Sequence, residues 1–78
     1  MLCNSLTAVE ATKAIALVRE GGKWNARRLQ LEIAKWNQNQ GLKDWHEFSE
    51  LLGMMEVYGM AKMVGVDSNG LAEFEWVK

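Results

Sequence analysis

Two side chains, Cys3 and His46, are the ones in this sequence best suited to bind a metal or to act in nucleophilic chemistry. Each is the only residue of its type among 78, so together they fall short of the ligands that a zinc site needs. His46 has one acidic residue a helical turn away, Glu50, and no plausible serine partner. The sequence also lacks glycine-rich phosphate loops and nucleophile motifs. We therefore expect no catalytic residue, no metal site and no cofactor, and a protein that is not an enzyme.

The charged residues divide the chain into a basic part and an acidic part. Residues 12–43 contain seven cations and two acids, for a net charge of +5. Residues 44–78 contain seven acids and two lysines, for a net charge of −5. The overall charge of −1 hides this division. Such a separation favours contacts between opposite charges, either between copies of the chain or with a charged partner.

The length and composition predict one small soluble domain over residues 1–78. The apolar fraction of 49% is sufficient for a core, and no apolar run approaches the roughly 20 residues that span a bilayer. The N-terminus has no basic region followed by a long apolar segment, so we expect a cytoplasmic protein without membrane contact. One core of this size stabilises a fold only marginally, and the single cysteine cannot form an internal disulfide. A protein partner or a second copy is therefore the expected source of further stability.

Apolar residues repeat at helical spacing in three segments, which predicts helices over about 7–20, 25–38 and 44–58. Thr7 and Glu10 form a T-x-x-E capping box at the start of the first helix. Asn25 is a good N-cap for the second helix. Asp44 and Glu47 repeat the capping pattern, as D-x-x-E, at the start of the third.

From residue 61 the apolar period changes from 3.6 to 2, which predicts a β-hairpin over about 61–77. Asn69-Gly70 favours a type I′ turn between the two strands, because both residues tolerate the positive φ that this turn requires. A turn at that place puts Met63 opposite Trp76 on the face of the hairpin that covers the core.

Large side chains on the predicted inward faces are expected to form the core. They are Trp36, Trp45, Met55, Tyr58, Met63 and Trp76. Trp24, in the segment between the first two helices, is expected to cap this core. Gly53 lies inside the third helix, where glycine costs roughly 1 kcal/mol relative to alanine. We therefore expect Gly53 to allow close packing against a neighbouring element.

The segment "LLGMMEVYGMAKMVGVDSNGLAEFEWV" resembles the recognition-helix end and wing of the winged helix-turn-helix family. The residues that match the family's E-x-x-G-[LM]-[AV] turn and its wing tip are Glu56, Gly59, Met60, Ala61 and Gly70. The segment "AIALVREGGKWNARRLQLEIAKWNQ" is similar to the family's first two helices. This resemblance implies an α+β fold, with a three-helix winged helix-turn-helix and a C-terminal two-stranded β-hairpin wing. It also implies duplex DNA as a partner, with the third helix in the major groove.

The predicted third helix and wing carry the wrong charge for the phosphate backbone. Carboxylates at these positions repel DNA, so binding through the third helix is disfavoured. Our first hypothesis is an interaction module that contacts a protein, either a second copy in a homodimer or another partner. Methionine adapts to irregular surfaces and suits such a contact. The residues expected at this protein interface are Glu47, Glu50, Met54, Val57, Glu73 and Glu75.

A basic patch around the second helix supports the alternative hypothesis, a small DNA-binding transcriptional regulator. The residues expected to bind nucleic acid in that case are Arg19, Lys23, Arg27, Arg28 and Lys35. Two further interpretations of this patch stay open from the sequence alone. It is an ordinary solvated face, or it meets the acidic half of a second copy.

Overall fold

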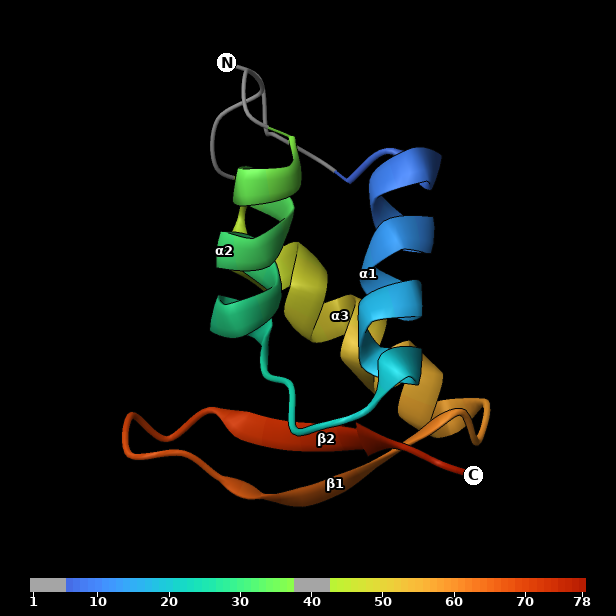
Figure 1. Ribbon diagram of the computed structural model, residues 1–78. Coiled ribbons are helices and arrows are strands. Elements are labelled where there is room, and N and C mark those ends of the chain that lie inside the picture. The colour runs from blue at the N-terminus through green and yellow to red at the C-terminus, as the bar shows by residue number, and fades with distance from the viewer. Residues whose placement is uncertain (1–5, 38–42) are drawn as a thin grey trace.

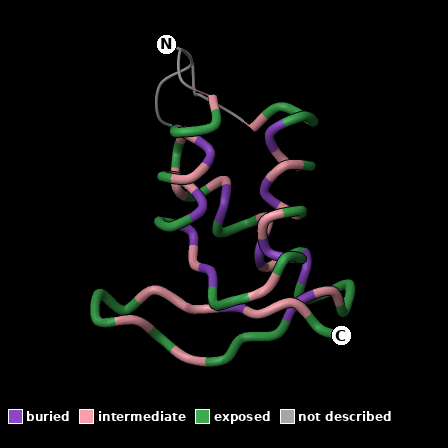
Figure 2. Tube along the Cα trace, viewed as in Figure 1, coloured by how far each residue is buried: buried purple, intermediate pink, exposed green. Residues whose placement is uncertain are grey.

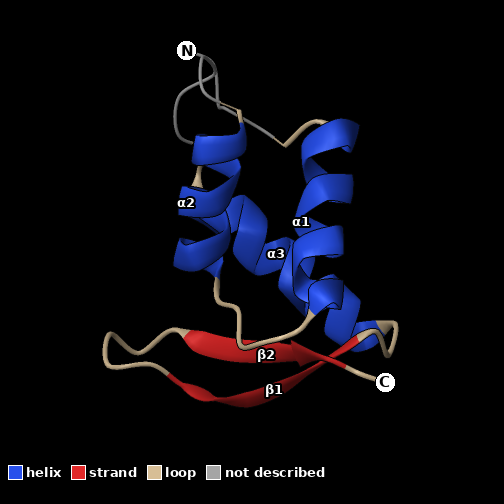
Figure 3. Ribbon diagram, in the orientation of Figure 1, coloured by secondary structure: helices blue, strands red, loops and turns tan. Residues whose placement is uncertain are grey.

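The computed structural model describes residues 6–37 and 43–78, and it contains three helices followed by an antiparallel hairpin (Figure 1). The elements are α1 (Ala8–Glu20), α2 (Ala26–Trp36), α3 (Trp45–Val57), β1 (Ala61–Val66) and β2 (Ala72–Trp76). The hairpin lies across one end of the helical layer (Figure 3). The predicted α+β class is confirmed, with a winged-helix-like layout. No helix in the described ranges has the length and apolar character needed to cross a membrane.

The helices begin at the predicted caps. The Thr7 hydroxyl accepts from the Glu10 amide at 3.2 Å, and the Glu10 carboxylate accepts from the Thr7 amide at 3.0 Å, which completes the capping box. The Asn25 side chain accepts from the Arg28 amide at 2.8 Å. Asp44 caps α3 by accepting from the amide of His46. The α2 helix ends at Trp36 rather than at about residue 38, which lies outside the described residues.

The second half of the D-x-x-E capping prediction at α3 is wrong. The carboxylate of Glu47 does not return to its own helix cap; it accepts the backbone N–H of Leu6 at 3.4 Å. This contact joins the start of α3 to the residues just before α1. The capping pattern therefore predicted the helix start correctly, but Glu47 serves a tertiary contact instead.

One carboxylate, that of Glu10, is buried where the three helices come together. Its exposed fraction is 2%, and Lys43, just before α3, lies with its Nζ 3.5 Å from Oε1. The side-chain amide of Asn37, at the end of α2, donates to Oε2. Burial by itself would raise the pKa of the Glu10 carboxyl. The hydrogen bonds from Thr7 and Asn37 and the charge of Lys43 outweigh that effect and hold the pKa below its usual value.

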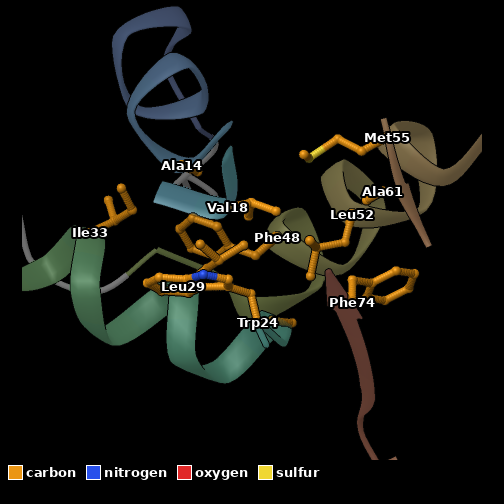
Figure 4. Packing of buried hydrophobic residues seen from close by; sticks show 11 residues of the cluster. Ala14, Val18, Trp24, Leu29, Ile33, Phe48, Leu52, Met55, Ala61 and Phe74 are labelled. Carbon is orange, nitrogen blue, oxygen red and sulfur yellow. The ribbon is translucent and has the colours of Figure 1, made fainter. Parts of the chain in front are cut away.

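The apolar core joins all three helices to the hairpin, as Figure 4 shows. Its buried members are Ala14, Val18, Trp24, Ala26, Leu29, Ile33, Phe48, Leu52, Met55, Ala61 and Phe74. These positions lie on the sides of the helices that face one another, whereas most of β1 is exposed (Figure 2). The prediction for Met55 is confirmed. Trp45 and Trp76 are partly buried and pack against the cluster.

Three residues predicted in the core are exposed instead. Trp36 is at the last position of α2, where it lies beside α1 but stays 44% exposed, and Tyr58 follows the last position of α3. Met63 faces the same side of the hairpin as the buried Phe74, but it is exposed. The helical spacing of apolar residues predicted burial correctly in the middle of each helix. It failed at the helix ends, where the burial of a side chain depends on how far the neighbouring elements extend.

The hairpin turn differs from the predicted type I′ turn. Among the described residues only glycines have positive φ, so Asn69 does not adopt the left-handed conformation, and Gly70 alone does, with φ of 86°. The carboxylate of Asp67 instead accepts from the amides of Asn69 and Leu71, at 2.8 and 2.9 Å. The Asp67 amide donates to the carbonyl of Leu71 at 2.9 Å, which closes a longer loop than expected.

The longer loop and a β-bulge together shift the strand register. Met63 pairs with Phe74 and Ala61 pairs with Trp76, so the predicted pairing of Met63 with Trp76 is wrong by two residues. One residue of this shift comes from the loop closed by Asp67, and the other comes from the bulge between Met63 and Gly65. A bulge places two residues of one strand opposite one of the other, which sequence alternation does not reveal.

Trp24 pairs with Phe74 of β2 as an isolated antiparallel β-bridge. Its amide donates to the carbonyl of Phe74 at 2.8 Å, and the Phe74 amide donates to the carbonyl of Trp24 at 2.7 Å. The Trp24 indole is buried and donates to the carbonyl of Gly21 at 2.9 Å. The expected role of Trp24 as a cap on the core is confirmed, and its backbone also fixes β2 against the α1–α2 connection.

The substitution Glu10→Gln tests the buried carboxylate. The pKa of Glu10 is lower in the folded chain than in the unfolded chain, so its charge stabilises the fold above the unfolded pKa. That stabilisation is lost as the pH falls through the folded pKa. We expect Glu10→Gln to lower the free energy of unfolding near neutral pH by about 2 kcal/mol. The difference from the unsubstituted protein should shrink toward acid pH in urea titrations.

The exposed Glu20, at the other end of α1, supplies a matched control. Glu20→Gln should leave both the unfolding free energy and its pH dependence near those of the unsubstituted protein. If Glu10→Gln follows the same pH profile as the unsubstituted protein, the Glu10 carboxylate does not contribute through its charge.

Candidate functional site

The outward side of α3 presents apolar side chains between carboxylates. Met54 is 54% exposed, Val57 is 82% exposed and Tyr58, next to the helix end, is 71% exposed. Glu50 lies one helical turn before Met54 on the same stripe, and it is also exposed. We call this surface the α3 patch and define it as Glu50, Gly53, Met54, Glu56, Val57 and Tyr58.

Gly53 lies in the middle of the α3 patch and has no packing role among residues 6–37 and 43–78. A Cβ atom built at this position meets no atom within 4 Å, so the expected close packing of Gly53 against a neighbouring element is wrong. Glycine at an interior helical position costs roughly 1 kcal/mol relative to alanine. The fold therefore carries this cost without a compensating contact among the described residues.

The carboxylates predicted for the interface occupy three different environments. Glu50 is exposed, and so is Glu56, the other carboxylate of the α3 patch. Within the described ranges neither has a basic side chain at ion-pair distance. Glu47 is half-buried and holds the amide of Leu6, so it is already occupied. Of the two α3 carboxylates predicted for the interface, only Glu50 lies beside Met54 and Val57 without an ion pair among the described residues.

The wing carboxylates lie away from the α3 patch. Glu73 and Glu75 flank the buried Phe74 along β2, so they belong to the face of the sheet that points away from the helices. Lys62 stands opposite Glu75, and Gly65 stands opposite Glu73. The structure therefore brings together Glu50, Met54 and Val57 but places the two wing glutamates on a separate surface.

β1 exposes apolar side chains along the edge of the sheet. Met63, Val64 and Val66 are exposed, and no other strand of the described chain pairs with the outer edge of β1. The bulge between Met63 and Gly65 interrupts the regular row of backbone groups that an added strand would need. This edge is therefore a poor site for strand addition.

The five predicted nucleic-acid-binding cations have different local contacts. Arg28 lies over the Trp24 ring at 4.0 Å, and its guanidinium donates to the carbonyl of Lys23. Arg19 lies 6.0 Å from the Trp76 ring centroid, beside the hairpin. Lys35 forms an exposed ion pair with Glu32 at 3.3 Å, while Lys23 and Arg27 are exposed.

Leu31 is an exposed apolar residue that the sequence analysis missed. It lies in the middle of α2, is 49% exposed, and has Arg27 and Lys35 one helical turn away on either side. Its position opposite the buried stripe of Leu29 and Ile33 was the signal that could have identified it. We call Arg27, Arg28, Leu31 and Lys35 the α2 face.

A second apolar surface lies along the outer side of α1. It is a shallow groove lined by Ala8, Val9, Thr12, Lys13, Ala16 and Trp36. The ammonium of Lys13 lies 5.9 Å from the Trp36 ring centroid. Trp36, exposed at the end of α2, forms part of this groove. Because Trp36 was expected in the core, the sequence did not predict this surface.

His46 lies at the first turn of α3 and stacks on its neighbour Trp45, with 3.9 Å between ring centroids. In residues 6–37 and 43–78 no three His, Cys, Asp or Glu side chains are grouped as metal ligands, and Cys3 lies outside these ranges. Searches against protein-family models, curated proteins and solved structures found no match to this chain. The surfaces described above therefore carry the functional argument.

The substitution Gly53→Ala tests whether glycine at the centre of the α3 patch is costly to the fold. Alanine restores helix propensity and meets no neighbouring atom, so the free energy of unfolding should rise by roughly 0.5–1 kcal/mol. Thermal and urea unfolding measure this change. A loss of stability would mean that the Gly53 backbone is strained in a way that the packing does not reveal.

Proposed function

We propose that this protein is a non-enzymatic interaction module on a winged-helix scaffold, and that it binds a protein partner through the α3 patch. The observation that carries the proposal is the exposure of Met54 and Val57 on the outward side of α3. Glu50 and Glu56 are exposed on the same helix, and within the described residues neither has an ion-pair partner. An apolar surface with a charged rim is typical of a protein interface.

The charge of the α3 patch argues against the usual winged-helix contact with duplex DNA. A helix that enters the major groove passes between phosphate backbones, and Glu50 and Glu56 would repel them. Glu73 and Glu75 on the outer face of the hairpin have the same effect for the wing. Within residues 6–37 and 43–78, no cation of the first two helices lies at ion-pair distance from these carboxylates.

The substitution Met54→Lys tests the proposal. It places a positive charge in the α3 patch, and this charge would lose its water when a partner binds. The affinity for the protein partner, or for a second copy, should therefore fall at least about tenfold. Sedimentation velocity measures self-association, and binding to captured partners from the source cell is compared between the variants. The α1 residue Val9 is also exposed, so Val9→Lys is the matched control and should leave association unchanged. Equal association in both variants would contradict a contact through Met54.

A second candidate function, DNA binding, rests on a different observation. Lys23 and Arg27 are exposed and lack an ion pair in the part of the chain that the structure describes, and Arg28 is held nearby on Trp24. Three cations around the start of α2 can contact phosphates without involving α3. Such a mode needs additional cations from a second copy, since few phosphate contacts give weak binding.

The double substitution Lys23→Glu with Arg27→Glu tests this second candidate without disturbing the Arg28–Trp24 stack. If the basic residues bind duplex DNA, binding should become much weaker, and the slope of log affinity against log salt should decrease by about two. Fluorescence anisotropy with random duplex DNA at several salt concentrations measures both quantities. Absence of salt-sensitive binding by the unsubstituted protein would exclude this function.

A further inference from the structure

The outward side of α2 has the opposite arrangement of charge to the α3 patch. Leu31 lies opposite the buried stripe of α2, and Arg27 and Lys35 lie one turn before and one turn after it. Arg28 is close to Leu31 on the same side. The ion pair between Lys35 and Glu32 is exposed, and exposed pairs contribute little, so it does not prevent Lys35 from meeting another carboxylate. The α2 face is thus an apolar side chain surrounded by cations.

The α3 patch is open at one helical position, and the α2 face carries the exposed Leu31 beside a shallow hollow lined by Arg28, Leu31, Glu32, Ala34 and Lys35. Gly53 has no side chain, and Glu50 and Glu56 lie three residues before and three residues after it. Val57, four residues after Gly53, adds exposed apolar surface beside this open position. A side chain that enters a space between residues of adjacent turns is the usual way in which helices pack.

We propose that the partner of the α3 patch is the α2 face of a second copy of this chain. Leu31 of one copy packs over Gly53 of the other, beside Val57. Arg27 and Lys35 are about 12 Å apart along their helix, and Glu50 and Glu56 are about 9 Å apart along theirs. Long, flexible cationic side chains cover that difference. This inference rests on the proposed function, because it names the partner of the same surface.

Charge excludes the simpler pairings of identical surfaces. Two α3 patches brought together would place Glu50 and Glu56 of one copy against the same carboxylates of the other. Two α2 faces would bring Arg27, Arg28 and Lys35 against their own equivalents. Each of these pairings costs repulsion, whereas contact between an α2 face and an α3 patch sets opposite charges around an apolar centre.

This contact explains why the α3 patch has a glycine at position 53, where glycine lowers the stability of the helix. Alanine at position 53 would raise the helix propensity and meets no atom within 4 Å among the described residues, but its methyl group would occupy the space that receives Leu31. Glycine therefore weakens the isolated fold and permits closer approach of the second copy. Gly53→Ala should fold at least as stably as the unsubstituted protein and self-associate less tightly.

A mixing experiment tests which two surfaces meet. Leu31→Glu puts a carboxylate on the α2 face, and Met54→Lys puts a cation on the α3 patch, so each variant alone should associate at least about tenfold more weakly than the unsubstituted full chain. A mixture retains one intact α2 face on the Met54→Lys chain and one intact α3 patch on the Leu31→Glu chain. The two variants should therefore form a one-to-one complex in sedimentation velocity, and circular dichroism checks that each is folded.

The outcomes separate this inference from the proposed function. Recovery of association in the mixture supports contact between the α2 face and the α3 patch. If Met54→Lys is monomeric while Leu31→Glu associates like the unsubstituted chain, the pairing is overturned but the α3 patch remains a protein-binding surface. If the unsubstituted protein is monomeric at all accessible concentrations, the second copy is overturned as partner. If neither substitution alters an observed assembly, both the inference and the proposed function fail.

Discussion

A buried carboxylate determines how the three helices meet. Glu10 completes the cap of α1, accepts from Asn37 at the end of α2, and pairs with Lys43 just before α3. Removing water from a carboxylate is costly unless hydrogen bonds and opposite charge replace it, and here both do. The relative placement of α2 and α3 follows from this junction and from the core below it. Because the outward sides of these two helices carry the candidate surfaces, the junction also sets the angle between those surfaces.

The hairpin is positioned by a second set of contacts, at the opposite end of the helical layer. Trp24 pairs through its backbone with Phe74, whose side chain enters the core, while the Trp24 indole covers the core from the α1–α2 connection. Once Phe74 faces inward, Glu73 and Glu75 must face outward. The separation of the wing carboxylates from the α3 patch is therefore a direct consequence of strand alternation about one buried phenylalanine.

The sequence was sufficient where the structure depends on neighbouring residues along the chain. Thr7 and Asn25 identified helix starts, and the apolar stripe of α3 identified Met55 as an inward-facing position. These features arise from hydrogen bonds and side-chain directions within a few residues. The same local logic identified the exposed Met54 and Val57, because they lie opposite the buried stripe of α3.

Tertiary contacts decided the features that the sequence analysis missed. Glu10 satisfies a capping pattern, but nothing in that pattern reveals Asn37 or Lys43. The side chain of Asp67 competes successfully with Asn69-Gly70 for control of the turn, and the resulting register leaves Met63 exposed. For the candidate site, the sequence showed only that positive and negative residues are separated along the chain. The proposed contact between the α2 face and the α3 patch could be assigned to individual residues only from the structure, which places Leu31 and Gly53 on outward helical sides.

The irregularity at Val64 bears on whether further strands can add to the edge of β1. An edge strand as apolar as β1, if regular, would be a template on which further chains could stack by backbone hydrogen bonds, in the manner of cross-β fibrils. The extra residue in β1 twists the strand and breaks that template after a few residues. The contact that we propose between molecules uses side chains on the outward sides of α2 and α3 instead of added strands.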